Sequence, residues 1–365
     1  MAGARTKRSH GGAFILAAFL LTLFGLVILL SSSVPLSQKN FGESYYYFRH
    51  QLLFGFGLGV ILFFICRTIG YRRLRLLALP LFIISLILLA LVFVPQLSYS
   101  AGGARSWLEI AGFSFQPSEI AKLALVLYLA LWLDKNRQKI GTTASMIPFL
   151  IITGLVTGLV VFQPDIGTAA VIALTGLIMY FAAGARFKAL LIILVIGAVL
   201  FGTLVVTHPE RVSRIVTPFT VSEDTQGENY QINQALIAIG SGGFTGRGLG
   251  KSVQKYQYLP ESIGDSIFAI IGEELGFLGA GALLLVFVFL LFTGLKIAKR
   301  AKTNFGTYLT VGVVAWLGLQ TFFNVAGILG IFPFTGLPLP FISYGGTALA
   351  VELAAVGLVS SVARE

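Results

Sequence analysis

Residues 258–268 read Tyr258-Leu259-Pro260-Glu261-Ser262-Ile263-Gly264-Asp265-Ser266-Ile267-Phe268, and they join a polar loop to an apolar run that continues to about residue 295. A run of that length can cross the roughly 30 Å hydrocarbon core of a bilayer as a helix. Asp265 lies at the junction, so its carboxylate is predicted at the membrane edge. An ionisable residue in that position is by default a functional-site hypothesis.

Similar apolar runs recur along the 365 residues, of which 56% are hydrophobic and 11% charged, against about a quarter charged in a soluble domain. The predicted spans are 14–34, 50–69, 74–95, 117–134, 145–162, 165–183, 187–206, 267–295, 306–331 and 341–362. The first is longer than a signal-peptide core, so it is predicted to be retained. We therefore expect an all-α, polytopic integral membrane protein with about ten transmembrane helices. Residues 1–365 form one transmembrane domain, with a cytoplasmic tail at 1–13 and a large extracytoplasmic loop at 207–266 between helices seven and eight.

The basic residues predict which loops face the cytosol. The chain has 26 Lys and Arg residues and a net charge of +11. Those before the first span or in every second loop are Arg5, Lys7, Arg8, Arg67, Arg72, Arg73, Arg75, Lys135, Arg137, Lys139, Arg186, Lys188, Lys296, Lys299, Arg300, Lys302 and Arg364. By the positive-inside rule these ends and both termini are cytoplasmic. Basic loops suit an anionic lipid surface, and we expect no nucleic-acid partner.

Metal, disulfide and nucleotide sites are not predicted. Cys66 is the single cysteine, and the three histidines are far apart without ligand spacing. The glycine-rich segment 240–252 resembles a phosphate-binding P-loop, but Thr245 stands where the pattern requires its first glycine. Its glycines are expected to allow tight turns or close approach to a ligand, or simply a flexible loop.

The predicted outer loop keeps five cations against the positive-inside bias: Arg211, Arg214, Arg247, Lys251 and Lys255. Such a cluster favours an anionic partner such as a phosphate or pyrophosphate. The alternative is a solvated face balanced by the acidic residues of the same loop.

Other polar residues lie at helix ends or inside spans. Glu119 and Lys122 are three residues apart after the first-turn Pro117, so they can pair on one helix face. The pair either is structural or shapes an outward cavity. Asp165 fits a helix N-cap. Glu352 is expected to face the bundle interior without a catalytic role.

Seven short motifs together resemble the SEDS family (shape, elongation, division and sporulation) of membrane glycosyltransferases. They are Gln116-Pro117-Ser118-Glu119-Ile120-Ala121-Lys122, Gln163-Pro164-Asp165-Ile166-Gly167-Thr168, Ala238-Ile239-Gly240-Ser241-Gly242-Gly243, Gly246-Arg247-Gly248-Leu249-Gly250, Tyr258-Leu259-Pro260-Glu261, Gly272-Glu273-Glu274-Leu275-Gly276-Phe277 and Pro338-Leu339-Pro340-Phe341-Ile342-Ser343-Tyr344-Gly345-Gly346. Their joint order and spacing are specific. The overall pattern favours the division-type FtsW branch over the elongation-type RodA branch.

The resemblance implies an inverting hexosyltransferase that polymerises lipid II, its donor and acceptor, on the outer face of the bacterial cytoplasmic membrane. Asp265 matches the family's catalytic aspartate, and Glu119 and Lys122 match its functionally important pair. The family commonly has His and Thr before this aspartate, whereas this chain has Ile263 and Gly264. A mechanism that uses that histidine cannot operate here.

In this reading Asp265 is the general base that takes the proton of the acceptor hydroxyl, and cations stabilise the departing pyrophosphate. The candidate substrate-binding residues are Glu119, Arg105, Lys122, Arg211, Arg214, Arg247, Lys251, Lys255 and Ser343. The sequence establishes no cofactor. A divalent cation such as Mg²⁺ or Mn²⁺ could assist, but the sequence shows no dedicated metal site.

By the same resemblance, the partner would be a class B penicillin-binding protein transpeptidase, with other proteins of the divisome or elongasome. Two alternatives stay open. A flippase or transporter would expose the lipid-linked headgroup across the bilayer without forming glycosidic bonds. A non-enzymatic scaffold would tolerate a charge-neutral change at Asp265.

Overall fold

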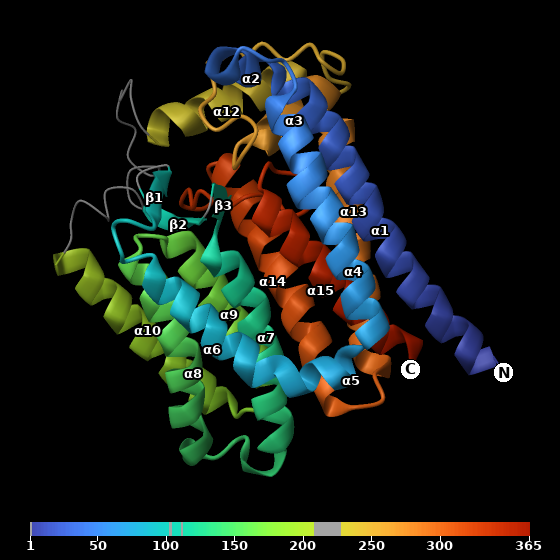
Figure 1. Ribbon diagram of the computed structural model, residues 1–365, viewed down its shortest axis with the longest axis vertical. Helices are drawn as coiled ribbons and strands as arrows, with labels where there is room; N and C mark the ends of the chain where they lie inside the picture. The colour runs from blue at the N-terminus through green and yellow to red at the C-terminus, as the bar shows by residue number, and fades with distance from the viewer. Residues whose placement is uncertain (1, 102–103, 111, 208–227) are drawn as a thin grey trace.

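The protein is a bundle of long helices, seen in a computed structural model that describes residues 2–101, 104–110, 112–207 and 228–365. The helices in chain order are α1 (Ala2–Ser32), α2 (Val34–Phe41), α3 (Tyr46–His50), the π-helix η1 (Gln51–Gly57), α4 (Leu58–Ile69), α5 (Tyr71–Leu74), η2 (Arg75–Leu77), α6 (Ala78–Leu91), α7 (Pro117–Lys135), η3 (Arg137–Lys139), α8 (Thr143–Phe162), α9 (Ile166–Ala182), α10 (Phe187–Thr207), α12 (Glu228–Gly242), α13 (Ile267–Arg300), α14 (Asn304–Ile328) and α15 (Gly346–Arg364). Both termini lie at one end of the bundle, and α2 and α12 lie at the other (Figure 1).

The prediction of an all-α polytopic membrane protein is confirmed, but the count of ten spans is not. Each predicted span coincides with a helix. Within the described residues, seven helices are long and apolar enough to cross a membrane. The apolar part of α10 and the whole of α9 are shorter, and α7 carries four charged side chains, Glu119, Lys122, Asp134 and Lys135. The hydropathy of those three helices therefore does not by itself show that they span.

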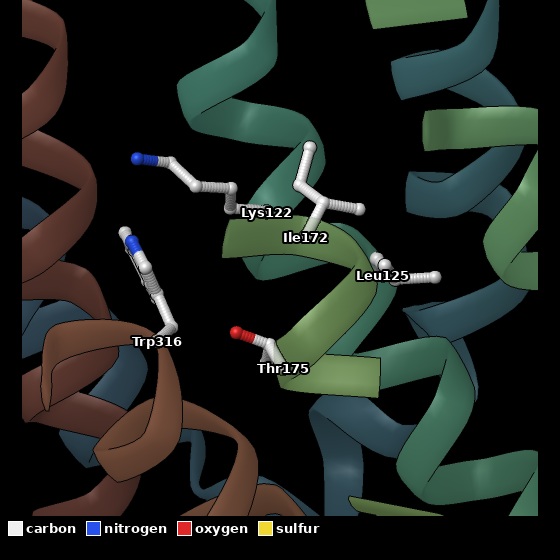
Figure 2. A pocket seen from close by; sticks show the side chains of 5 residues that line it. All are labelled: Lys122, Leu125, Ile172, Thr175 and Trp316. Carbon is white, nitrogen blue, oxygen red and sulfur yellow. The ribbon is translucent and has the colours of Figure 1, made fainter. Parts of the chain in front are cut away.

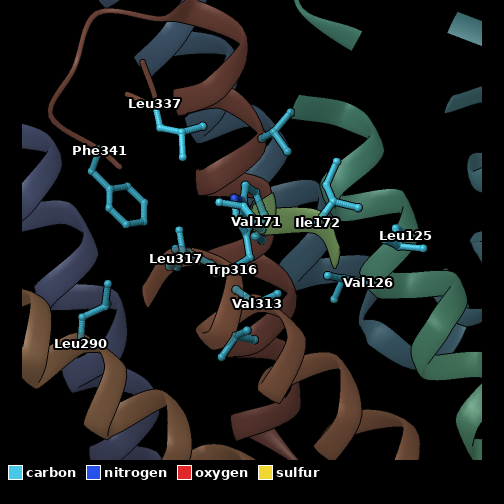
Figure 3. Packing of buried hydrophobic residues seen from close by; sticks show 14 of the residues in the cluster. Leu125, Val126, Val171, Ile172, Leu290, Val313, Trp316, Leu317, Leu337 and Phe341 are labelled. Carbon is cyan, nitrogen blue, oxygen red and sulfur yellow. The ribbon is translucent and has the colours of Figure 1, made fainter. Parts of the chain in front are cut away.

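Two helices, α14 and α15, form the centre of the bundle and are buried along most of their length. Figure 3 shows part of the core, where Val313 and Trp316 of α14 face Val126 of α7 and Ile172 of α9. The α4 and α15 backbones come close together, because a Cβ at Gly357 would lie 2.5 Å from the Phe63 carbonyl oxygen. Small residues allow this close packing between membrane helices.

Helix α13 is broken at Gly276, where the backbone has φ 67° and ψ −168°. Only glycine adopts this region readily. The break separates residues 267–275, which follow Asp265, from the longer segment up to Arg300. Phe277 and Leu278 then donate backbone hydrogen bonds to Gly243 and Phe244, at 2.9 and 3.1 Å. The predicted span at 267–295 is therefore not one continuous helix but is broken near its N-terminal end.

We expect Gly276→Ala to lower the free energy of unfolding. The unfavourable backbone conformation alone should cost about 1–3 kcal/mol. The added Cβ would also meet the Gly246 nitrogen and would lie 2.8 Å from the Phe244 carbonyl oxygen. Gly281→Ala is the matched control in the same helix, since its Cβ meets nothing within 4 Å. Equal melting temperatures of the two variants in detergent would contradict the role of the break.

Two structured elements were not predicted, a small sheet before α7 and a helix within residues 207–266. Residues expected as a loop before α7 form an antiparallel sheet of β1 (Ser98–Ala101), β2 (Ala104–Ile110) and β3 (Phe113–Phe115) in the order β1-β2-β3. The predicted loop at 207–266 contains helix α12, whose residues Ile232, Ala235 and Ala238 are buried. Apolar residues three positions apart are typical of one buried helix face, so the sequence pattern could have predicted this helix.

Candidate functional site

Asp265 lies in the turn that leads into α13, and neighbouring side chains hold its carboxylate on one side. Its Oδ1 accepts hydrogen bonds from Gln231 Nε2 of α12 at 3.1 Å and from Ser266 Oγ at 3.4 Å. Gln231 also donates to Ser266 Oγ at 2.7 Å. The residue is only half-buried, and no protein donor in the described part of the chain is recorded for Oδ2. One carboxylate oxygen is thus oriented while the other stays available.

Burial of the carboxylate and the nearby negative charge of Glu261 raise the pKa of Asp265 to about 8. The hydrogen bonds from Gln231 and Ser266 act in the opposite direction, because they stabilise the anion. A pKa near the working pH suits a group that must accept and then release a proton.

The main chain around Asp265 is held as firmly as its side chain. Asn324 Nδ2 of α14 donates to the Asp265 carbonyl at 2.7 Å, and Tyr344 N donates to the Ile263 carbonyl at 2.8 Å. The two residues before Asp265, Ile263 and Gly264, therefore contribute backbone carbonyls. These contacts do not depend on the side chains at those positions.

Ser343 contacts the same turn. Its hydroxyl donates to the Gly264 carbonyl at 2.6 Å and accepts from Leu339 N at 2.8 Å. The side chain is buried, with 6% exposure. Both functions of the hydroxyl are occupied inside the protein, which favours support of the turn over direct contact with a substrate.

Glu119 and Lys122 form the predicted pair inside the bundle. Lys122 Nζ lies 2.8 Å from Glu119 Oε1 and donates to Gln320 Oε1 of α14 at 2.7 Å. It also lies 5.0 Å from the ring centre of Trp316. The two side chains are only 1% and 2% exposed, so water cannot stabilise their charges and each charge is stabilised by the other. Lys122 and Trp316 line a small cavity (Figure 2). Its volume is about 10 Å³, roughly the space of one water molecule.

Two cations of the predicted outer loop, Lys255 and Arg247, pair with the adjacent acids Glu274 and Glu273 of α13. Lys255 is buried, and its Nζ lies 3.0 Å from Glu274 Oε1 and donates to the Gly250 carbonyl at 2.6 Å. Arg247 is 41% exposed and lies 3.5 Å from Glu273 Oε1. Lys251 is exposed. Of these three, only Arg247 and Lys251 present charge to an incoming anion.

The structure does not bring all the predicted residues together. Glu273 is eight residues after Asp265, which is about 12 Å along a helix, so the cations paired with Glu273 and Glu274 do not contact the Asp265 carboxylate directly. Arg105 is in strand β2, and Arg211 and Arg214 lie outside the described residues. The described residues hold no group of three or more His, Cys, Asp or Glu side chains that could bind a metal ion.

Three residues that support the site were missed by sequence reasoning: Gln231, Gln320 and Asn324. Gln320 and Asn324 are amides four residues apart in an otherwise apolar segment, which places them on one helix face. Polar residues inside a membrane helix are costly and therefore informative. Gln231 gave no comparable signal, because its segment was predicted as a loop.

Comparison with known proteins agrees with this arrangement. The family model FTSW_RODA_SPOVE, described as cell cycle protein, matches residues 12–365. The chain is 38% identical to stage V sporulation protein E of Bacillus subtilis over 359 residues, covering 98% of each chain. It is 37% identical to the probable peptidoglycan glycosyltransferase FtsW of Geobacter sulfurreducens over 352 residues, covering 95% of this chain and 93% of the relative.

Two solved structures share the fold. One is described as "Structural coordination of polymerization and crosslinking by a peptidoglycan synthase complex", with a TM-score of 0.79, 29% identity and 96% coverage of each chain. The other is the rod shape determining protein RodA of Thermus thermophilus, with a TM-score of 0.71, 29% identity and coverage of 96% and 95%. The chain belongs to the FtsW/RodA/SpoVE family, the SEDS proteins.

Proposed function

We propose that the protein is a peptidoglycan glycosyltransferase that polymerises lipid II into glycan strands, with Asp265 as its general base. The single observation that carries this role is the Asp265 carboxylate. It is oriented through one oxygen, available through the other, and has its pKa raised to about 8. Relatives at 37% identity carry the name of this activity.

In the proposed reaction the 4-hydroxyl oxygen of the acceptor GlcNAc attacks C1 of the donor MurNAc. The new β-glycosidic bond forms as the α-linked bond to the undecaprenyl pyrophosphate breaks, so one inversion suffices. Asp265 accepts the hydroxyl proton, and the pyrophosphate leaves with the bonding electron pair. The leaving group needs positive charge more than a proton, and exposed cations supply it.

Among the cations, Arg247 and Lys251 are the proposed pyrophosphate contacts because their charge is exposed. Lys255 and Lys122 are bound to buried acids and are proposed to keep those acids neutralised. A divalent cation such as Mg²⁺ or Mn²⁺ could assist the departure of the pyrophosphate; the described residues hold no group of three or more His, Cys, Asp or Glu side chains for it.

The proposed setting is the bacterial cytoplasmic membrane, with both termini in the cytosol and Asp265 on the outer face. The charge pattern of the loops supports this orientation. The proposed partner is a class B penicillin-binding protein, together with divisome or elongasome proteins, since a solved relative is described as part of a synthase complex that couples polymerization and crosslinking.

The test is a glycan-product gel with purified full-length protein and lipid II, run with and without the transpeptidase. A ladder of polymerised product is expected. Movement of lipid II across vesicle membranes without any ladder, with and without the partner, would instead support the flippase alternative.

The rate is expected to depend on pH through Asp265. The carboxylate must be deprotonated to accept a proton, so kcat/KM should rise with pH up to about 8 and level off above it. Gln231→Met removes a hydrogen bond that stabilises the anion, so its acidic limb should move to higher pH. A pH profile of Gln231→Met superimposable on that of the parent would contradict the assignment.

A further inference from the structure

Residues 337–345 form the second half of the connection between α14 and α15, and they contact the turn that carries Asp265. We infer that this segment, here named the strap, holds Asp265 in its working position, and that Asn324, Gln51 and Glu352 are positioning residues of the glycosyl transfer. The inference rests on the proposed function and deepens it, because it explains how a general base in a turn is held in a fixed position.

Two consecutive residues of the strap donate hydrogen bonds to the turn that carries Asp265. Ser343 Oγ donates to the Gly264 carbonyl at 2.6 Å, and Tyr344 N donates to the Ile263 carbonyl at 2.8 Å. Just before the strap, a Cβ at Gly336 would lie 3.6 Å from Asp265 Oδ2. The carboxylate that is open to substrate therefore lies directly beside this segment.

Asn324 joins the strap to Asp265 itself. Its Nδ2 donates to the Asp265 carbonyl and to the Leu337 carbonyl, both at 2.7 Å. One amide group thus uses both of its N–H donors to bridge the catalytic residue and the start of the strap. The side chain is buried, with 3% exposure, so water offers no easy replacement for these bonds.

Gln51 and Glu352 anchor the other side of the strap to the inner bundle. Gln51, the first residue of η1, donates to the Ser343 carbonyl at 3.3 Å and accepts from Gly345 N at 3.0 Å. Glu352 Oε2 of α15 accepts from Phe341 N at 2.7 Å. Phe341 has a φ of 64°, which is uncommon for a bulky residue and needs support from its surroundings.

The side of the strap that faces the bundle also packs against the apolar core and accepts a hydrogen bond from α14. Leu337 and Phe341 reach into the apolar core near Leu317 (Figure 3), and Gln320 donates to the Pro338 carbonyl at 2.9 Å. Gln320 is in turn bonded to Lys122. The buried ion pair, the strap and the catalytic turn are thus connected by one series of hydrogen bonds.

These anchors can restrict the base because they are buried. Gln51 and Glu352 are 2% and 1% exposed, and a polar group that loses its partner in such surroundings is costly. The strap therefore has one favourable position, in which all of these hydrogen bonds form. Misplacement of a catalytic group by about 1 Å can cost about 10²-fold in rate. The side chains of Asn324, Gln51 and Glu352 bond to other protein groups. We therefore expect a change at any of them to alter the reaction rate by displacing Asp265.

The test measures full pH profiles of lipid II polymerisation for Asn324→Leu, Gln51→Met and Glu352→Leu, each in the full chain with its transpeptidase. We expect kcat to fall by about 10²-fold with little change in KM. We also expect the acidic limb to move to lower pH. A loosened strap admits water to Asp265 and reduces the burial that raises its pKa, while Glu261 remains the charged neighbour acting on it.

Matched variants separate positioning from general destabilisation. Thr321→Val and Ser360→Ala each remove a buried hydroxyl that bonds only within its own helix, and both should retain the parent's kcat and pH profile. Glu352→Gln keeps an oxygen that can accept from Phe341 N, so it should recover most of the rate lost in Glu352→Leu. A Glu352→Gln as slow as Glu352→Leu would overturn the role of that hydrogen bond.

Failure of the strap and failure of the base are distinguishable. If Asp265→Asn is inactive while folded Asn324→Leu and Gln51→Met keep the parent's kcat, the strap inference is overturned and the proposed function stands. A fall in kcat with an unmoved acidic limb would also overturn it, because partial misfolding alone gives that result. If Asp265→Asn remains fully active, the base assignment itself fails.

Discussion

Asp265→Asn is expected to lower the rate of glycan synthesis from lipid II by about 10²–10⁴-fold, the usual contribution of a positioned general base. The amide has the size of the carboxylate, and its oxygen can still accept the hydrogen bond that Gln231 donates. It cannot, however, take up the proton of the acceptor hydroxyl. The loss should therefore appear in kcat, measured from product gels over time, with the melting temperature close to that of the parent.

Glu43→Gln is a suitable control for Asp265→Asn. Glu43 is an exposed acid between α2 and α3, where it pairs with Arg49. Neutralising it removes a charge from the α2–α3 connection without touching the α13 turn, so full activity is expected. Undiminished synthesis by folded Asp265→Asn would remove the carboxylate from the mechanism.

Lys122→Met is expected to destabilise the protein by about 3–5 kcal/mol, the typical cost of breaking a buried ion pair. The change leaves Glu119 buried, with 1% exposure, and without the cation 2.8 Å from its Oε1. It also removes one of the two donors to Gln320 Oε1, the other being Trp316. Thermal unfolding in detergent micelles would report the loss.

A double variant tests the cause of the Lys122→Met effect. Glu119→Gln combined with Lys122→Met removes both charges, so it should recover much of the stability lost in the single variant. Lys251→Met, an exposed lysine of the outer loop, should change stability by no more than about 0.5 kcal/mol. A Lys122→Met melting temperature equal to that of Lys251→Met would contradict the account of the pair.

Several local features could be predicted because they depend on residues close in sequence. Pro117 opens α7 as predicted, and Asp165 caps α9 by accepting from Thr168 N at 3.0 Å. Glu119 and Lys122 pair because three helical residues place them on one face. Glu352 faces the interior, as the apolar character of its helix suggested.

Other features could not be predicted because they depend on residues far apart in sequence. The break in α13 follows from the approach of Gly246 and Phe244 to Gly276. Lys255 was predicted as a substrate contact on the basis of charge, and the structure places it in an ion pair with Glu274. Charge and spacing identify such residues as polar, but they do not say whether a protein partner already occupies them.

The sequence by itself determined that the chain is a helical membrane protein, that its loops alternate in charge, and that Asp265 lies at the end of a membrane helix. Apolar run length is sufficient for the helices, because backbone polar groups in the bilayer core must be paired within the chain. The charges of the loops and the position of Asp265 can be read directly from the residues. Only the tertiary structure decided how Asp265 is held. Asn324 is 59 residues away in the chain, and the packing of α14 against the strap brings its amide to the Asp265 carbonyl.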